Sequence, residues 1–266
     1  MNDAAVRERF HAAADIAVLA GRELAARFRR ELSIRFKGRS DPVTDADIAS
    51  ERLIRERIAA LFPGDFVLAE EFHDDGEPGA EFWSVDPLDG TVNYSHGLPW
   101  YTVSIGWVSG GEPVFGVVYA PEFGWLFAAM RGGGARLNGR PLKVSGTSDL
   151  SRALVASGFP YDRAATRENF AEHEAVLLAV QDVRQTGCAS LDICFLAKGA
   201  FDAYYEFGLG PWDFTAGWVI AEEAGARVAA PRGGRPRVLG REFLAASPLL
   251  VDPLVAIISK AGEGRT

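Results

Sequence analysis

Two aspartates three residues apart, Asp86 and Asp89, follow an apolar run in the segment FWSVDPLDGTVNYSHG, residues 82–97. A tight turn needs one Asp or one Gly, so turn chemistry alone does not explain both carboxylates. Adjacent carboxylates repel each other unless a positive charge lies between them. The spacing therefore predicts a bound metal ion, or two ions if one carboxylate bridges them.

Further carboxylates end apolar stretches elsewhere in the chain. Glu70 and Glu71 follow the run FVLA, Asp213 stands in PWDF, and Asp47 lies on a predicted helix next to the loop SDPVT. Each acid taken singly has an ordinary explanation as a solvated strand end or a helix cap. Together, oxygen ligands from several segments favour magnesium or another hard divalent ion.

Gly90 and Thr91 follow Asp89 directly, at a predicted helix start. Backbone N–H groups at such a start can bind a phosphate. Metal ions and amide donors together would hold a phosphoryl group and neutralise the charge that develops on it. The segment thus predicts metal binding by Asp86 and Asp89, and phosphate binding by Gly90 and Thr91.

The composition sets limits on fold and partners. The chain has 266 residues, 48% hydrophobic and 24% charged, which suffices for a sizeable core in one large domain or two close lobes. The net charge of -8 and the pI near 5.1 argue against nucleic acid and anionic membranes as partners. Anionic small substrates stay compatible, because a bound cation reverses the local field.

The few cysteines and the absence of a long apolar run predict a cytoplasmic protein. Cys188 and Cys194 form no CxxC motif, and two thiols in a chain this long favour a reducing compartment. The sequence contains no run of about 18 apolar residues, so no membrane-spanning helix is predicted. The first segment does not resemble a signal peptide. The histidines are scattered without zinc-ligand spacing: His11, His73, His96 and His173.

Strands and helices alternate along the chain, which predicts α/β or α+β layers. Helical periodicity covers residues 4–30, 45–62, 190–199, 211–225 and 249–260. Strands are predicted over 65–71, 82–86, 153–159, 182–185, 201–206 and 242–247, with β-rich segments over 102–121 and 124–144. Residues 34–44 are predicted to be a loop that ends at Thr44, the N-cap of the second helix, and Pro211 is predicted to begin another helix.

Four blocks in order resemble the inositol monophosphatase family of phosphatases, and the resemblance covers nearly the whole chain. They are DPVTDAD at 41–47, LAEE at 68–71, WSVDPLDGTVNYSHGLP at 83–99 and PWDFTAGWVIAEEAG at 211–225, with a softer fifth match at 184–206. The resemblance implies a five-layered αβαβα sandwich, dependence on Mg2+ with two or three ions per subunit, inhibition by lithium, and a homodimer. It implies a single unit over 1–266, with a metal- and phosphate-binding lobe at 1–148 and a substrate-side lobe at 149–266.

The resemblance also implies a role for each matching residue. Glu70, Asp86 and the Leu88 carbonyl would hold the first Mg2+; Asp86, Asp89 and Asp213 would hold the second, and Glu70 would border a third site. Thr91, hydrogen-bonded to Asp47, would orient or deprotonate the attacking water, which makes Glu70, Thr91 and Asp47 the expected catalytic residues. The Gly90 and Thr91 amides would bind phosphate. Asp89, Gly187, Cys188, Ala189 and Glu206 would contact the alcohol, and Lys37 matches a lysine of a metal-binding loop.

Two positions depart from the family pattern, and two others are expected only to support their neighbours. Cys188 stands where family members often have Ser or Thr, and the stretch from Lys37 to DPVT is one residue short. Glu71 and Trp212 are expected to support neighbouring ligands, Trp212 as a packed aromatic residue.

The expected function is a Mg2+-dependent phosphomonoesterase acting on a small polyol or sugar phosphate, with inositol 1-phosphate as the first candidate. Fructose 1,6-bisphosphate and histidinol phosphate remain alternative substrates. A different class is a non-catalytic regulatory binding protein on the same fold. Such a protein should lack at least one of the five expected metal and water residues, and this chain retains them all: Glu70, Asp86, Asp89, Thr91 and Asp213.

Overall fold

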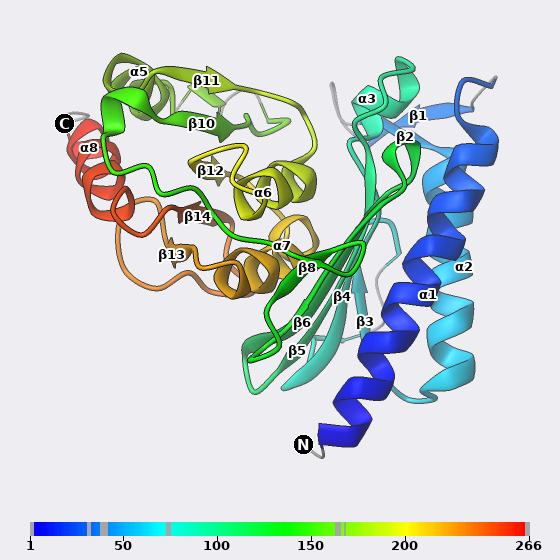
Figure 1. Ribbon diagram of the computed structural model, residues 1–266. Helices are drawn as coiled ribbons and strands as arrows, with labels where there is room; N and C mark the ends of the chain where they lie inside the picture. Colours follow the sequence, from blue (N-terminus) through cyan, green and yellow to red (C-terminus); the bar gives the residue numbers. More distant parts are fainter. Residues whose placement is uncertain are drawn as a thin grey trace.

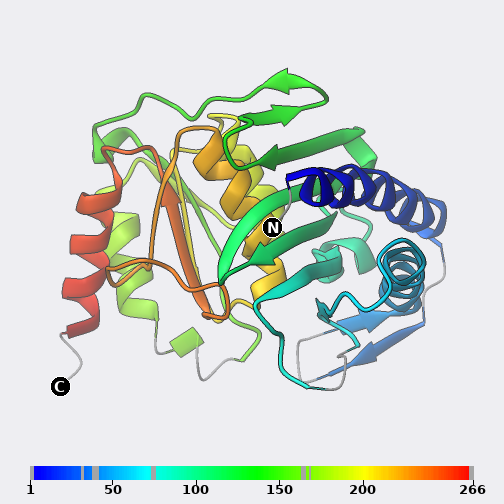
Figure 2. The same ribbon diagram turned by 90° about the horizontal axis from the view of Figure 1, so that it is seen from below.

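The computed structural model describes residues 3–30, 33–37, 42–72, 76–162, 166–167 and 169–263. Its elements stack in five layers: a helix pair, a seven-stranded sheet, a second helix pair, a five-stranded sheet and a third helix pair (Figure 1). The view from below in Figure 2 shows the same succession from the blue and cyan helices to the red one. The predicted five-layered αβαβα sandwich is therefore confirmed.

The first helix pair covers one face of the seven-stranded sheet. α1 (Asp3–Arg27) lies against β5 and β6, and α2 (Asp45–Leu61) packs on α1 and on β4. The sheet has the order β3-β4-β5-β6-β7-β8-β9 and is antiparallel except between β3 and β4. Its strands are β3 (Val67–Ala69), β4 (Glu81–Asp89), β5 (Thr102–Ser109), β6 (Glu112–Ala120), β7 (Trp125–Met130), β8 (Ala135–Leu137) and β9 (Arg140–Pro141).

The middle layer consists of α6 (Ala189–Ala197) and α7 (Pro211–Glu223), which lie between the two sheets. α7 packs on β4, β5 and β6 on one side and on β13 and β14 on the other. Every residue of α7 from 214 to 221 is buried, as expected for a helix covered on both sides. Pro211 is the first residue of α7, as predicted from the lack of a backbone donor in proline.

The five-stranded sheet has the order β11-β10-β12-β14-β13, and α8 (Val251–Glu263) with α5 (Phe170–Ala179) forms the outer layer. Its strands are β10 (Leu154–Ser157), β11 (Asp182–Arg184), β12 (Ala203–Phe207), β13 (Arg227–Ala229) and β14 (Glu242–Ala246). The remaining short elements are β1 (Ile34–Phe36), β2 (Pro42–Thr44), α3 (Thr91–Ser95), η1 (Pro121–Phe123) and η2 (Leu150–Arg152).

Three predicted elements differ from the structure. Where residues 34–44 were predicted to be a loop, β1 pairs antiparallel with β2. β4 does not end at residue 86 but runs to Asp89, because pairing with β5 continues past Pro87 through a bulge. The strand predicted over 65–71 has strand pairing only over the three residues of β3.

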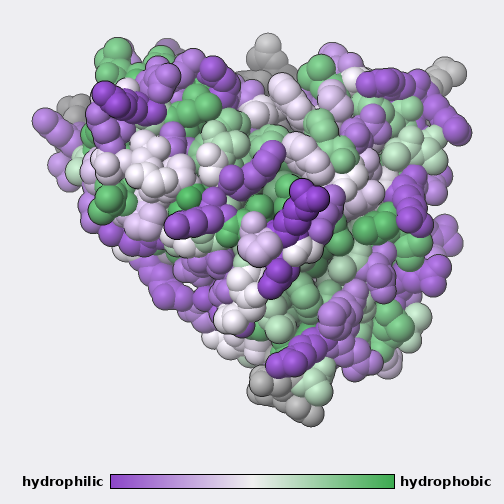
Figure 3. All heavy atoms as spheres, in the orientation of Figure 1, coloured by the Kyte–Doolittle hydropathy of each residue, from purple (hydrophilic) through white to green (hydrophobic). Residues whose placement is uncertain are grey.

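Helices of the second half pack against strands of both sheets, so the two halves share one middle layer. The lobe division near residue 148 stays a prediction. Within the described residues, no helix is long and apolar enough to cross a membrane. The face shown in Figure 3 carries hydrophilic and hydrophobic residues interspersed rather than one continuous apolar surface.

Candidate active site

A cavity of about 450 Å3 opens where the ends of β4, α6 and α7 meet. Its walls come from both halves of the chain, and six of the residues that line it are carboxylic acids: Glu70, Asp86, Asp89, Asp192, Glu206 and Asp213. Leu88, Gly90, Thr91, Gly187, Cys188 and Ala189 line the same cavity. The structure thus brings together residues that the sequence places up to 143 positions apart, from 70 to 213.

The bulge in β4 gives Asp86 and Asp89 access to the same cavity. Residues three apart on a regular strand point to opposite faces. Here Asp86 pairs with Ser104 and Asp89 with Thr102, so β4 advances by three residues while β5 advances by two. The Leu88 N–H donates to Asp86 Oδ1 at 2.9 Å and fixes the carboxylate within the bulge. Asp86 and Asp89 therefore line the same cavity because of one extra residue in β4.

Asp89 also caps the N-terminus of α6. Its Oδ2 accepts from the Ser190 N–H at 2.7 Å and from the Ser190 hydroxyl at 2.6 Å, while Oδ1 accepts from the Ala189 N–H at 3.3 Å. The Cys188 thiol lies 3.2 Å from the same carboxylate. The free N–H groups and the positive end of the helix stabilise the negative charge of Asp89.

Asp213 is held in a similar way at the start of α7. Its Oδ2 accepts from the Gly210 N–H at 2.7 Å, which leaves the carboxylate at the helix N-terminus and next to the cavity. Trp212 immediately precedes it, and the Trp212 carbonyl accepts from the Ser104 hydroxyl at 3.1 Å. This backbone contact ties the first turn of α7 to β5.

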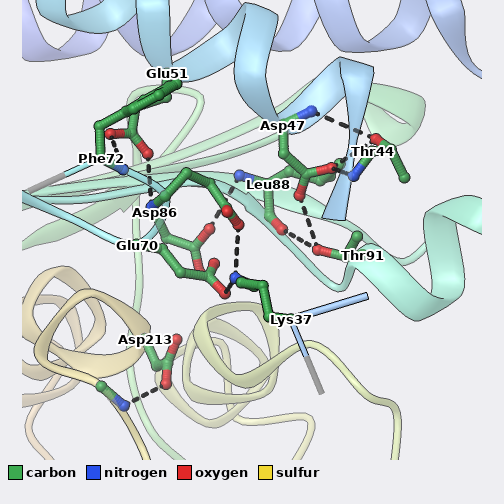
Figure 4. Close-up of polar contacts among 12 residues, drawn as sticks. Lys37, Thr44, Asp47, Glu51, Glu70, Phe72, Asp86, Leu88, Thr91 and Asp213 are labelled. Atoms are coloured by element: carbon green, nitrogen blue, oxygen red, sulfur yellow. Dashed lines mark hydrogen bonds and ion pairs between the residues drawn. The ribbon is translucent and has the colours of Figure 1, made fainter. Parts of the chain in front are cut away.

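Glu70 and Glu71 follow β3 and share one cation. Lys37 Nζ lies 2.8 Å from Glu70 Oε1 and 2.8 Å from Glu71 Oε1. Figure 4 shows the ion pair between Lys37 and Glu70. The buried Glu51 of α2 accepts from the N–H groups of Glu71 and Phe72, both at 2.9 Å, and so holds the chain that follows Glu70.

Thr91 links the cavity to Asp47 on α2. The Thr91 hydroxyl lies 3.0 Å from Asp47 Oδ1 and 3.0 Å from the Leu88 carbonyl. The other Asp47 oxygen accepts from the Thr44 N–H at 2.8 Å, so Thr44, the predicted N-cap, forms a capping box with Asp47. Gly90 has a φ of 91°, and a Cβ there would lie 2.7 Å from the Trp100 carbonyl, so this position requires glycine.

The carboxylates beside the cavity have raised pKa values. Burial raises the pKa of Asp86 well above its usual range, and the charges of Glu70, Asp89 and Asp213 raise it further. Burial likewise raises the pKa of Asp213, and raises that of Glu70 to about 7 although Lys37 opposes this. Because these carboxylates repel one another, an added positive charge stabilises their ionised forms.

The donor set fits hard divalent cations, because it consists of carboxylate and carbonyl oxygens. In the part of the chain that the structure describes, no three His, Cys, Asp or Glu side chains converge on one ion position. Each carboxylate is turned toward its own protein partner instead: Glu70 to Lys37, Asp86 to Leu88, Asp89 to Ser190 and Asp213 to Gly210. All four carboxylates nevertheless line the same cavity.

Glu206 and the segment that precedes α6 line the same cavity. Glu206 Oε2 accepts from the Tyr204 hydroxyl at 2.8 Å, and burial raises the pKa of Glu206 to about 7. Burial raises the pKa of the Cys188 thiol well above its usual range, and the neighbouring Asp89 adds to the effect. The thiol is therefore protonated at neutral pH and acts as a weak donor.

Four buried polar residues at the site were missed from the sequence: Glu51, Asn93, Ser190 and Asp192. Ser190 and Asp192 fall in the first turn of an otherwise apolar helix, and polar residues on a buried helix face were a signal that could have been followed. The backbone groups at Glu71 and Thr186 that bond Glu51 and Asn93 lie 20 and 93 positions away, so no local pattern marked these contacts.

Known proteins resemble this chain over most of its length. The model of the inositol monophosphatase family matches residues 6–262. The chain is 43% identical over 233 residues to the inositol-1-monophosphatase SuhB of Mycobacterium tuberculosis, covering 83% of this chain and 79% of the relative. It is 37% identical over 229 residues to the Nus factor SuhB of Vibrio cholerae, covering 85% and 86%. The structure of inositol monophosphatase from Anabaena (Nostoc) sp. PCC 7120 superposes with a TM-score of 0.87 at 36% identity, covering 96% of each chain.

Proposed function

Since the chain belongs to the inositol monophosphatase family and so is a phosphatase, we propose that it hydrolyses a small polyol monophosphate with magnesium as its cofactor. Inositol 1-phosphate is the first candidate substrate. The observation that carries the proposal is the meeting of Glu70, Asp86, Asp89 and Asp213 at one cavity, beside the Thr91–Asp47 hydrogen bond.

The proposed ligands divide into two sets that share Asp86. Glu70, Asp86 and the Leu88 carbonyl would hold one Mg2+; Asp86, Asp89 and Asp213 would hold another, and Glu70 would border a third. Bound magnesium supplies a water of lowered pKa and neutralises charge on the phosphoryl and leaving oxygens. Lys37, which contacts Glu70 and Glu71, keeps part of this negative charge balanced.

Thr91 and Asp47 are proposed to orient and deprotonate the attacking water. The Thr91 hydroxyl donates toward Asp47, so its oxygen lone pairs are available to accept a proton from water. Burial raises the pKa of Asp47, which makes this carboxylate a better proton acceptor than an exposed aspartate. The amides of Gly90 and Thr91 are proposed to hold the phosphate that the water attacks.

Glu206 is proposed to select a polyol over a second phosphate. A carboxylate repels a phosphate and accepts hydrogen bonds from hydroxyl groups. Gly187, Cys188 and Ala189 lie across the same cavity and are proposed to contact the alcohol. The same acidic wall disfavours fructose 1,6-bisphosphate, whereas histidinol phosphate, which carries one phosphate, is a closer competitor.

The decisive experiment measures phosphate release from inositol 1-phosphate, histidinol phosphate and fructose 1,6-bisphosphate, with magnesium, with chelator and after magnesium is restored. We expect turnover of the polyol monophosphate that is lost in chelator and recovered on restoring magnesium. Full turnover in chelator would refute the metal-dependent mechanism. Lithium inhibition is tested in the same assay, and native mass spectrometry tests the proposed homodimer.

The Vibrio cholerae relative named a Nus factor favours a second candidate function, a regulatory interaction with another macromolecule. The complete set of acids beside Thr91 supports catalysis as the main role. Gel electrophoresis of labelled RNA with and without the protein tests the regulatory function. The net charge of -8 predicts no direct RNA binding and therefore no change in mobility. A cytoplasmic location remains part of the proposal.

A further inference from the structure

The segment before α6 is held from the side of α3 by one buried amide. Asn93 Nδ2 lies 2.8 Å from the Thr186 carbonyl, 3.2 Å from the Gly187 carbonyl and 2.9 Å from the Trp100 carbonyl. Asn93 is 7% exposed and lies two residues after Thr91 on α3. It therefore joins the helix next to the proposed phosphate site to the segment that faces the alcohol.

The same segment is held from the side of α6 by a buried carboxylate. The Thr186 hydroxyl donates to Asp192 Oδ1 at 2.6 Å, and Asp192 is 2% exposed. Asp192 also lines the cavity, on the side of Glu206. Asn93, Thr186 and Asp192 thus form one chain of hydrogen bonds from α3 to α6.

A buried carboxylate is costly, and an apolar residue of similar size would stabilise a helix between two sheets better. The other residues of α6 are mostly apolar, and Leu191, Ile193 and Leu196 are fully buried. Asp192 departs from this pattern only where the helix meets the cavity. Its position is explained if the carboxylate serves the segment that it holds.

We propose that Asp192 is a positioning residue that, through Thr186 and Asn93, sets the distance between the phosphate-binding turn and the backbone of residues 187–189. The consequence is a fixed space for a compact polyol next to the phosphate. This inference rests on the proposed function, because it concerns how the same cavity selects its alcohol. It assigns Asp192 no direct contact with the substrate.

The test compares Asp192→Ala, Asp192→Asn and Thr186→Val on inositol 1-phosphate and on p-nitrophenyl phosphate, which has no hydroxyl groups to place. We expect Asp192→Ala and Thr186→Val to raise KM for the polyol phosphate about tenfold, the cost of losing a hydrogen bond to a charged group. The kcat should change less than threefold, and KM for p-nitrophenyl phosphate should rise much less. The KM of Asp192→Asn should stay close to that of the wild type, since an amide oxygen still accepts from the Thr186 hydroxyl.

Asp202→Asn is the matched control. Asp202 is 9% exposed and accepts from the Ser145 hydroxyl at 2.6 Å and from the Leu154 N–H at 2.7 Å, but it does not line the cavity. This variant should lower the melting temperature, whereas its KM for both substrates should equal that of the wild type. A double variant Thr186→Val/Asp192→Ala should be no worse than either single variant, because both break the same link.

Three outcomes would overturn the inference. Equal losses for Asp192→Asn and Asp192→Ala would mean that the charge acts directly on the substrate. Equal rises in KM for both substrates would mean that Asp192 supports the phosphate site or the fold, and additive losses in the double variant would show two separate effects. If the wild type prefers another phosphate ester, the proposed function fails, and the same comparison on that ester still tests Asp192.

Discussion

Ser190 donates both its backbone N–H and its hydroxyl to one oxygen of Asp89, at 2.7 and 2.6 Å. The two residues lie 101 positions apart, and the N-cap residue of α6, Cys188, provides no side-chain cap of its own. Asp89, at the end of β4 in the seven-stranded sheet, thus caps α6 in the middle layer. The residue proposed to bind metal and alcohol also holds the two halves of the chain together.

Ser190→Ala should destabilise the protein by about 1.5–3 kcal/mol, because it removes a hydroxyl that donates to a charged group. Ser84→Ala is the matched control: Ser84 is equally buried, and its hydroxyl has no hydrogen-bond partner within the described structure. Urea unfolding of both variants gives the difference. A loss in Ser84→Ala as large as in Ser190→Ala would contradict the capping argument.

Asp213→Asn should lower turnover at least about a hundredfold while the metal-free protein stays as stable as the wild type or becomes more stable. The amide removes repulsion from Asp89 and Glu70, and its oxygen can still accept from the Gly210 N–H. The shift in melting temperature on adding magnesium should shrink, because binding to the folded state weakens. Asp202→Asn controls for the loss of a buried carboxylate. If Asp213→Asn kept wild-type turnover and the wild-type rise in melting temperature on adding magnesium, Asp213 would not be a metal ligand.

Thr91→Val should reduce kcat by about a hundredfold or more, since the isosteric side chain can neither pass a proton to Asp47 nor orient water. Thr91→Ser keeps the hydroxyl and should retain most of the activity. Single-turnover kinetics separate this effect from product release. If the valine variant kept wild-type kcat, Thr91 would serve only to join α3 to α2.

Glu206→Gln should lower kcat/KM for a polyol monophosphate by about tenfold to a hundredfold, the range expected for a hydrogen bond to a charged group. The loss on p-nitrophenyl phosphate should be far smaller. Gly158→Ala gives an independent check, because a Cβ at residue 158 would clash with the Glu206 carboxylate and force it to move. Equal losses on both substrates would show that Glu206 acts on the metals or on the fold.

The free energy of unfolding should decrease as the pH falls, and His173 should account for part of the decrease. Its Nδ1 lies 2.8 Å from the Tyr205 hydroxyl, its Nε2 is buried without a hydrogen-bond partner in the described structure, and burial lowers its pKa to about 4. An unfolded histidine has a pKa of about 6.5. The stability contributed by the neutral ring is therefore complete above pH 6.5 and is lost as the pH falls toward 4, because only the unfolded state takes up the proton in that window.

His173→Phe should remove this dependence while keeping ring packing against Phe159 and Phe207. Between pH 7.5 and pH 5 the wild type should lose up to about 2 kcal/mol more stability than the variant. His11→Gln, at an exposed histidine of α1, is the control. Parallel stability curves for wild type and His173→Phe over this range would refute the prediction.

The sequence predicted those elements whose signals are local. The N-cap at Thr44 and the proline at the start of α7 depend on neighbouring residues, and both are present. The end of β4 was misplaced because Pro87 signals a turn locally, whereas its course is decided by pairing with β5. The β1–β2 hairpin was missed for a similar reason, since Gly38 and Pro42 are typical of loops.

The prediction of the site likewise succeeded where the signal was a local motif and failed where it depended on distant contacts. Motif blocks placed Glu70, Asp86 and Asp213 near one another, and the structure shows that they line one cavity. The residues that hold those acids could not be found in this way, because Ser190 and Glu51 act on groups that are distant in the sequence. Their roles became visible only from three-dimensional contacts.

The shared middle layer has a consequence for how the chain is made. During synthesis the seven-stranded sheet leaves the ribosome before α6 and α7, so its apolar inner face has no cover until the second half arrives. Contacts between such distant segments form slowly, and an exposed apolar sheet invites aggregation. The second proposed metal site cannot be complete in that intermediate, because Asp213, the last of its proposed ligands, is itself the third residue of α7. The sheet therefore stays uncovered, and the second proposed metal site stays incomplete, until α7 has packed against it.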